Sequence, residues 1–238
     1  FIVAGAAVLP GELISISPQA AVESVYSPAT LALDSGDLAE PQSILFASGS
    51  DNQQVHAFYY PPTNAQYCGI EGELPPVIAL CHGGPTGSAD SGLNLKLQYW
   101  CNRGFAVVDI NYRGSTGFGR AYRHSLAGAW GIADVQDTQK AIGYLTEQHI
   151  IDPQRCLIRG GSAGGYTVLS ALTFTDTFQA GASLYGIGDL ETLAKDTHKF
   201  ESRYMDSLIG PYPERRDIYL ERSPIHHAEG LNCPVIFL

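Results

Sequence analysis

A chain of 238 residues, 45% of them hydrophobic and 16% charged, has the composition of one large folded domain and excludes a disordered protein. Its formal net charge is −10, and residues 1–95 contain acidic residues but no lysine or arginine. Because such a surface repels phosphate backbones, we expect no nucleic acid partner. No run of 18 or more apolar residues occurs, so we expect no membrane partner.

The first 60 residues consist of short apolar or alternating segments separated by Pro, Gly, Asp and Asn, a pattern typical of β-strands. The apolar start lacks the basic residues of a signal peptide and is interrupted by Pro10, so we predict a strand there. Further strands are predicted in ELISIS, SILFAS and VHAFYY. The proline-rich stretch that follows, up to Pro76, is predicted to be a loop.

After Pro76 the pattern changes to alternating strands and helices. Strands are predicted at 77–81, 105–111, 156–160, 178–186 and 234–238. Helices are predicted at 93–100, 134–148 and 163–174. This alternation predicts the α/β class, with a mostly parallel, doubly wound sheet covered by helices on both faces. Ligands of such sheets bind beyond the carboxyl ends of the strands, where the loops HGGP, YRGS and GGSAG all lie.

The segment Gly160-Gly161-Ser162-Ala163-Gly164 has the G-x-S-x-G pattern. A predicted strand precedes it and a predicted helix follows it, as a nucleophile elbow requires. Gly160 and Gly164 lack the side chains that would prevent this tight turn from closing. We therefore predict that Ser162 is a catalytic nucleophile. The alternative is a glycine-rich strand-to-helix turn without chemistry.

A serine nucleophile needs hydrogen-bond donors for the oxyanion of its intermediate. The backbone N–H of Ala163, at the start of the following helix, is one candidate. The second should come from the loop after an earlier strand, and we favour Gly84, then Gly83. His82 precedes the serine, whereas this fold orders its triad Ser, acid, His, so we expect His82 to orient the loop rather than to act as the base.

The acid and base of the triad have no good candidates in the sequence. Three histidines follow Ser162, namely His198, His226 and His227. The pair at 226–227 precedes the last predicted strand, which should itself carry the triad acid at its carboxyl end. We therefore expect the triad Asp and His to lie outside residues 1–238. Without an adjacent base, residues 1–238 alone are expected to turn over peptide p-nitroanilides poorly, if at all.

The five cysteines are scattered, odd in number and form no C-x-x-C pair. This pattern indicates free thiols in a reducing compartment, which we take to be the cytoplasm. It argues against a disulfide scaffold and against a zinc site. We expect neither a metal nor a cofactor.

Six stretches resemble, in order, the prolyl oligopeptidase family and its acylaminoacyl-peptidase-like branch. They are PPVIALCHGGPTG, NYRGSTGFGRAYR, AWGIADVQDTQKAIGYL, IRGGSAGGYTVL, YGIGDLETLAKDTHKFESRYMDSLIGP and SPIHHAEGLNCPVIFL. Together they span about residues 75–238. The resemblance implies a serine peptidase with an α/β-hydrolase fold that hydrolyses short peptides by acyl transfer, of the acylaminoacyl-peptidase or dipeptidyl/oligopeptidase type.

The resemblance also implies a domain organisation. Residues 1–25 would be the end of an N-terminal β-propeller and its linker, and residues 26–238 a C-terminally incomplete hydrolase domain. Some members of the family place a tyrosine where this sequence has His82. Tyr112 and Arg113 are expected to hold a loop, and Trp130 and Asp134 to pack and to cap a helix.

Two alternatives to the peptidase remain at this point. A carboxylesterase or lipase uses the same HGG and G-x-S-x-G motifs, although the stretches NYRGSTGFG and THKFESRY favour the peptidase. A non-catalytic binding protein could retain the fold after losing its triad. Substrate length, side-chain preference and oligomeric state are left open by the sequence.

Overall fold

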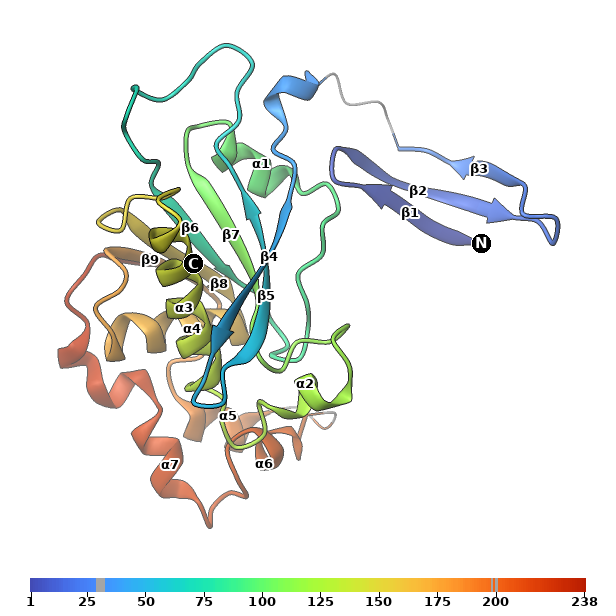
Figure 1. Ribbon diagram of the computed structural model, residues 1–238. Helices are drawn as coiled ribbons and strands as arrows, with labels where there is room; N and C mark the ends of the chain where they lie inside the picture. The colour runs from blue at the N-terminus through green and yellow to red at the C-terminus, as the bar shows by residue number, and fades with distance from the viewer. Residues whose placement is uncertain (29–32, 198, 200) are drawn as a thin grey trace.

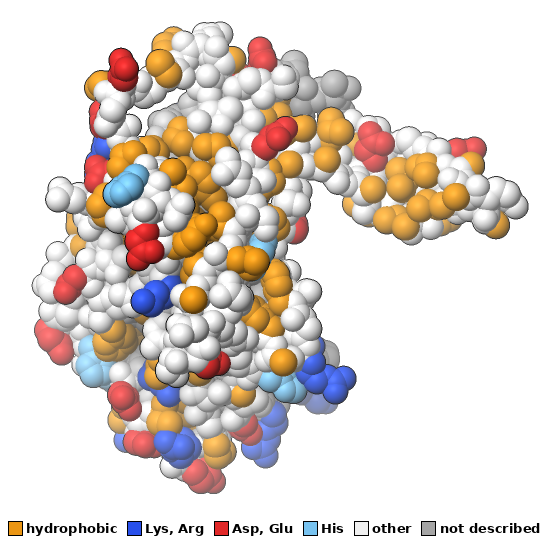
Figure 2. Space-filling model, in the orientation of Figure 1, with side chains coloured by type: hydrophobic (Ala, Val, Ile, Leu, Met, Phe, Trp, Pro, Cys, Tyr) orange, Lys and Arg blue, Asp and Glu red, His pale blue; other side chains and the backbone are white. Residues whose placement is uncertain are grey.

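The computed structural model describes residues 1–28, 33–197, 199 and 201–238, which form two separate β-sheets (Figure 1). The smaller sheet is an antiparallel meander that projects from the rest of the chain in Figure 1. Its strands are β1 (Ile2–Ala6), β2 (Leu9–Ile16) and β3 (Val22–Tyr26). Large apolar side chains such as Val3, Val22 and Tyr26 are exposed on it, as the projecting part of Figure 2 shows.

The larger sheet has seven strands in the order β10-β9-β8-β6-β7-β5-β4. It is parallel from β10 to β7, and β5 runs antiparallel to both of its neighbours. The strands are β4 (Gln42–Ser48), β5 (Gln53–Tyr60), β6 (Val77–Cys81), β7 (Ala106–Asn111), β8 (Cys156–Gly161), β9 (Ala180–Leu184) and β10 (Val235–Phe237). The predicted α/β class with a mostly parallel sheet is confirmed.

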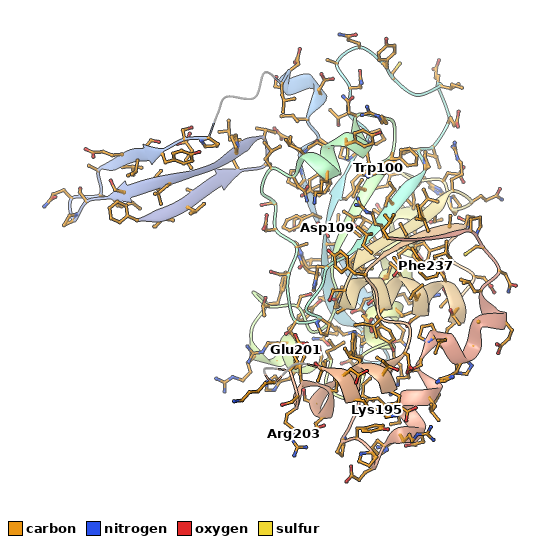
Figure 3. The ribbon with its side chains drawn as sticks, turned by 180° about the vertical axis from the view of Figure 1, so that it is seen from behind. Trp100, Asp109, Lys195, Glu201, Arg203 and Phe237 are labelled. Atoms are coloured by element: carbon orange, nitrogen blue, oxygen red, sulfur yellow. The ribbon has the colours of Figure 1, made fainter. Side chains whose placement is uncertain are left out.

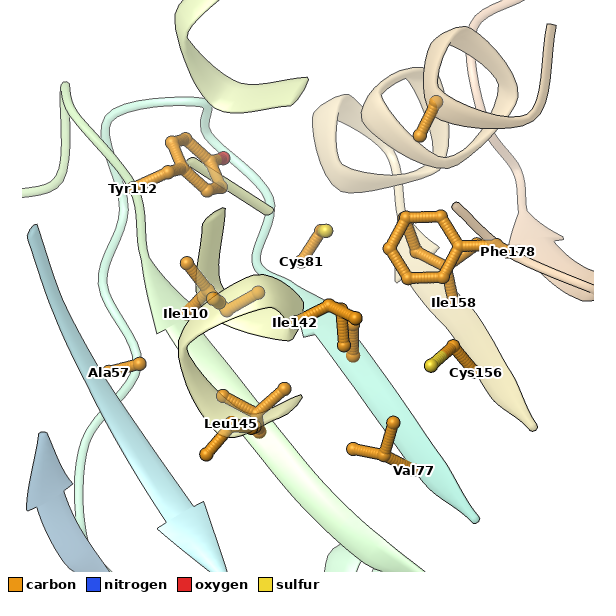
Figure 4. Close-up of a cluster of buried hydrophobic side chains, with 14 of the residues drawn as sticks. Ala57, Val77, Cys81, Ile110, Tyr112, Ile142, Leu145, Cys156, Ile158 and Phe178 are labelled. Atoms are coloured by element: carbon orange, nitrogen blue, oxygen red, sulfur yellow. The ribbon is translucent and has the colours of Figure 1, made fainter. Parts of the chain in front are cut away.

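Helices cover both faces of this sheet. On one face, α3 (Ala133–Glu147) and α4 (Ala163–Phe174) pack against the buried side chains of the central strands (Figure 4). On the other face, α1 (Leu95–Cys101) packs against Ile78 and Val107. None of the helices in the described ranges is long and apolar enough to cross a membrane.

Shorter elements complete the chain. They are η1 (Ser35–Asp37), α2 (Arg120–His124), α5 (Leu190–Asp196), α6 (Tyr204–Leu208), α7 (Arg216–Glu221) and η2 (Pro224–Gly230). Three of them, α5, α6 and α7, contribute to a second apolar cluster around Trp130 and Tyr166. Through this cluster the segment after β9 packs against α4, the helix that follows Ser162.

The face that carries α1 also carries an acidic and a basic side chain in one row. Asp109 on β7 and Arg159 on β8 both lie in register with Leu80 on β6, so one strand separates them. Asp109 and Trp100 line a cavity of about 340 Å³ on this face (Figure 3). Burial, and then the nearby Asp90, raise the pKa of Asp109 to about 7.

We expect Asp109→Asn to raise the free energy of unfolding at pH 8 by about 1–2 kcal/mol. The folded-state pKa of about 7 exceeds the unfolded value of 3.8, so the folded state binds the proton more tightly and loses stability as the pH rises from about 4 to 7. The difference between these two pKa values corresponds to ~4 kcal/mol. Because the carboxyl lines a cavity that water can enter, we expect a smaller effect. Urea denaturation at pH 4.5 and pH 8 measures the effect. The exposed Asp51→Asn should leave the pH dependence as it is, and equal pH dependence in Asp109→Asn and wild type would contradict the assignment.

Candidate active site

Ser162 lies in the turn between β8 and α4, at the carboxyl end of the central strands. Its backbone has φ of 55° and ψ of −121°, a left-handed conformation that a residue with a side chain rarely adopts. Two backbone hydrogen bonds hold this conformation: the Ser162 N–H donates to the Leu184 carbonyl, and the Tyr166 N–H donates to the Ser162 carbonyl, both at 3.0 Å. Strained backbone of this kind is concentrated at functional sites.

Glycines around Ser162 allow main-chain atoms to come into contact. A Cβ on Gly160 would touch the carbonyl oxygen of Gly164, and a Cβ on Gly164 would touch the carbonyl oxygen of Cys81 at the end of β6. A Cβ on Gly165 would lie 2.6 Å from the Cα of Gly186. The turn can therefore close against β6 and β9 only without these side chains.

The loop that begins at His82 lies beside the serine. A Cβ built on Gly83 would be 3.8 Å from the Cβ of Ser162, so the Cα of Gly83 faces the candidate nucleophile. Gly84 has φ of +125° and faces its own loop, where a Cβ would lie 2.6 Å from the Thr86 nitrogen. Ala163, the other proposed donor, is buried at the first position of α4. The three candidate donors thus lie in the two segments that flank Ser162 in space.

His82 is engaged by its own loop and by its neighbours. Its Nδ1 lies 2.8 Å from the Gly83 carbonyl oxygen, which can only accept, so Nδ1 carries the proton. Burial lowers the pKa of His82. Its Nε2 lies 2.7 Å from the oxygen of the Ser115 hydroxyl, which itself donates to the Tyr112 carbonyl at 2.7 Å. The ring also stacks on Tyr112, with 4.2 Å between ring centroids. Both nitrogens are occupied, consistent with a loop-orienting role.

Tyr112 and Arg113 hold the neighbouring loop, as the sequence suggested. The Tyr112 hydroxyl donates to the His82 carbonyl at 2.8 Å. Arg113 forms an ion pair with Asp137 of α3, in which its Nη2 lies 2.8 Å from Oδ1 and its backbone N–H donates to Oδ2 at 2.7 Å. Ser48 of β4 also donates to this carboxylate, at 2.5 Å. The pair is buried, because the side chains of Arg113 and Asp137 are 11% and 0% exposed.

Asp134 stabilises the loop before α3 rather than the helix itself. It accepts the Gly131 N–H and the Thr167 hydroxyl, both at 2.6 Å, and Thr167 belongs to α4. Burial raises the pKa of Asp134 to about 6. Ile132 is the N-terminal cap of α3, so the expected capping role of Asp134 is replaced by a link between α3 and α4. Trp130 packs on Tyr166 with ring centroids 4.6 Å apart, as expected.

The described histidines after Ser162 lie away from it. The ring of His227 packs on Phe174, the last residue of α4, with centroids 5.1 Å apart. Ser162 precedes the first residue of that twelve-residue helix, so about 18 Å of helix separates the two positions. His226 lies beside His227 in η2. His198 lies outside the described residues.

Two features near Ser162 were not found from the sequence. Tyr185 follows β9, has φ of 39° and is 75% exposed. Its hydroxyl lies where a Cβ added to Gly161 would be 2.9 Å away. The hydroxyl of Tyr204 lies 2.6 Å from Thr86 Oγ1. Both residues stand in the stretch YGIGDLETLAKDTHKFESRYMDSLIGP, but that stretch does not indicate which distant segment each of them contacts. In the described part of the chain, no group of three or more His, Cys, Asp or Glu could hold a metal ion.

Comparison with known proteins agrees with this geometry. The chain is 32% identical over 167 residues to dipeptidyl aminopeptidase BIII of Pseudoxanthomonas mexicana, and this alignment covers 68% of the chain and 24% of that protein. It is 30% identical over 204 residues to an acylamino-acid-releasing enzyme of Arabidopsis thaliana, and this alignment covers 81% of the chain and 26% of that protein. The chain therefore spans about a quarter of the curated relatives it matches.

Solved structures are similar over nearly the whole chain. A puromycin-hydrolyzing peptidase of Mycobacterium tuberculosis has a TM-score of 0.95 and 42% identity, covering 99% of this chain and 36% of its own. A Pyrococcus horikoshii acylaminoacyl peptidase has a TM-score of 0.81 and 26% identity, covering 98% and 36%. The sequence pattern described as "Prolyl oligopeptidase family" matches residues 91–238. The chain belongs to the prolyl oligopeptidase family.

Proposed function

We propose that this chain is the catalytic part of a serine peptidase that hydrolyses short peptides by acyl transfer through Ser162, of the acylaminoacyl-peptidase or dipeptidyl/oligopeptidase type. The observation that carries the proposal is the left-handed Ser162, held between glycines at the end of β8 with Gly83 facing it. Membership of the prolyl oligopeptidase family supports it, as do relatives named as dipeptidyl and acylamino-acid peptidases.

In the proposed mechanism, Ser162 Oγ attacks the scissile carbonyl carbon while its proton passes to the triad histidine. The oxyanion that forms is stabilised by the backbone N–H of Ala163 and by an N–H of Gly84 or Gly83. The histidine then protonates the leaving amine, and water hydrolyses the acyl-enzyme. We propose that the triad Asp and His come from outside residues 1–238, since His226 and His227 lie at the far end of α4.

We further propose that residues 1–25 belong to a β-propeller and residues 26–238 to the hydrolase domain. The separate sheet formed by β1 to β3, which ends at Tyr26, supports this boundary. Its exposed apolar side chains suit a sheet that packs against others. A cytoplasmic location is supported by the five cysteines, which are all free thiols, three of them buried.

Labelling of the full-length protein with a fluorophosphonate tests the proposal. Wild type should label, Ser162→Ala should not, and peptidase activity of the variant should fall by at least about 10⁴-fold. Ser50→Ala, in the exposed turn between β4 and β5, is the matched control and should label like wild type. Labelling that survives Ser162→Ala would overturn the assignment. The ratio of peptide to ester turnover separates a peptidase from a carboxylesterase.

A further inference from the structure

The loop from His82 to Ala89 carries a candidate oxyanion donor and is held on one side by the end of β7 and the loop after it. Ser115 binds His82 at 2.7 Å. The Thr116 N–H donates to the Gly87 carbonyl at 2.9 Å, and the Ala89 N–H donates to Asn111 Oδ1 at 2.8 Å. These contacts fix the two ends of the loop to the sheet. They leave Thr86, in its middle, to be held by another part of the chain.

That other part is α6. The hydroxyl of Tyr204, the first residue of α6, lies 2.6 Å from Thr86 Oγ1, although the two residues are 118 positions apart in the sequence. Tyr204 is half-buried and packs against the apolar cluster around Trp130. A short bond between two hydroxyl groups at a partly buried site is directional, so it restrains both partners.

The position of Tyr204 is in turn tied to the helix that follows Ser162. The carbonyl of Ser207 in α6 accepts the Gly128 N–H at 2.9 Å, which joins α6 to the segment that contains Trp130. Trp130 packs on Tyr166 of α4, and the Tyr166 N–H donates to the carbonyl of Ser162 at 3.0 Å. A continuous series of contacts therefore runs from Thr86 through α6 to the elbow.

We infer that Tyr204 is a positioning residue, which through Thr86 fixes the oxyanion loop relative to the N-terminus of α4. This inference rests on the proposed function. Oxyanion donors act only when both lie about 2.7–3.1 Å from the position of the developing charge. One candidate donor lies in the loop that begins at His82, and the other lies at the N-terminus of α4. A displacement of about 1 Å costs roughly a hundredfold in rate. Removing the Tyr204 hydroxyl should therefore weaken stabilisation of the transition state while leaving substrate affinity unchanged.

The test uses the full-length protein and two conservative variants, Tyr204→Phe and Thr86→Val, with their double variant. Each single variant should lower kcat by about tenfold at unchanged KM. Because both remove the same bond, the double variant should lower kcat by no more than about tenfold as well. Tyr67→Phe, at an exposed loop position, is the control and should leave both constants unchanged. Thermal melting should show all variants folded.

Three results would overturn the inference while Ser162→Ala remains inactive: kcat of Tyr204→Phe within twofold of wild type, losses that multiply in the double variant, or a rise in KM at unchanged kcat. The last would make Tyr204 a substrate contact. Retained labelling of Ser162→Ala would instead remove the proposed function, and the inference with it. The two failures are thus distinguished by whether Ser162→Ala is labelled.

Discussion

Gly164→Ala is expected to abolish fluorophosphonate labelling and to lower the free energy of unfolding by about 3 kcal/mol or more. The added methyl group would touch the carbonyl oxygen of Cys81 and lie 2.8 Å from that of His82. These are backbone atoms of β6 and its loop, and β6 is paired on both sides in the centre of the sheet. Neither can move without displacing the elbow. Urea denaturation and labelling of the same preparation measure the two effects.

Gly143→Ala provides the matched control for this substitution. Gly143 lies inside α3, and a Cβ added there would have no other heavy atom within 4 Å. Alanine has the higher helix propensity, so this variant should gain about 0.5–1 kcal/mol and label normally. If Gly164→Ala proved as stable and as reactive as Gly143→Ala, close backbone packing at the elbow would be the wrong explanation.

Asp137→Ala is expected to destabilise the protein by about 3–5 kcal/mol, because it leaves the buried guanidinium of Arg113 without its counter-charge. Asp137 also accepts the Arg113 backbone N–H and the Ser48 hydroxyl, and both donors would lose their partner. Burial raises the pKa of Asp137, and its hydrogen bonds with Arg113 and Ser48 oppose that shift. Denaturation at pH 7 measures the loss.

The exposed ion pair between Arg155 and Glu73 is the comparison. Its atoms are also 2.8 Å apart, but the side chains are 42% and 45% exposed. Glu73→Ala should therefore cost no more than about 1 kcal/mol. Equal effects from Glu73→Ala and Asp137→Ala would show that burial is not what makes the Arg113 pair important.

The strand β6 could be predicted closely because it is a continuous apolar run, and β7 because it begins with one. Strands predicted at 77–81 and 105–111 are observed at Val77–Cys81 and Ala106–Asn111. The elbow could also be predicted from neighbouring residues, because its tight turn requires glycines on both sides of Ser162. The nucleophile and donor roles of Ser162, Ala163, Gly83 and Gly84 stay predictions.

What could not be predicted depends on residues far apart in the sequence. The helices α5 to α7 are short, and they are stabilised by packing against Trp130 and Tyr166 rather than by their own periodicity. The contact between Thr86 and Tyr204 joins the loop after β6 to the first residue of α6, 118 positions further along the sequence. Asp134 looked like a helix cap, because the sequence does not show that Thr167 comes within reach of its carboxylate.

The strand order of the larger sheet determines which strands can pair first during synthesis. β6 can pair with β7 as soon as residue 111 has left the ribosome, and β5 and β4 are already available to extend that edge. The other edge of β6 stays open until β8 emerges at residues 156–161. During that interval one edge of an apolar central strand has no partner, so it is open to pairing with other chains.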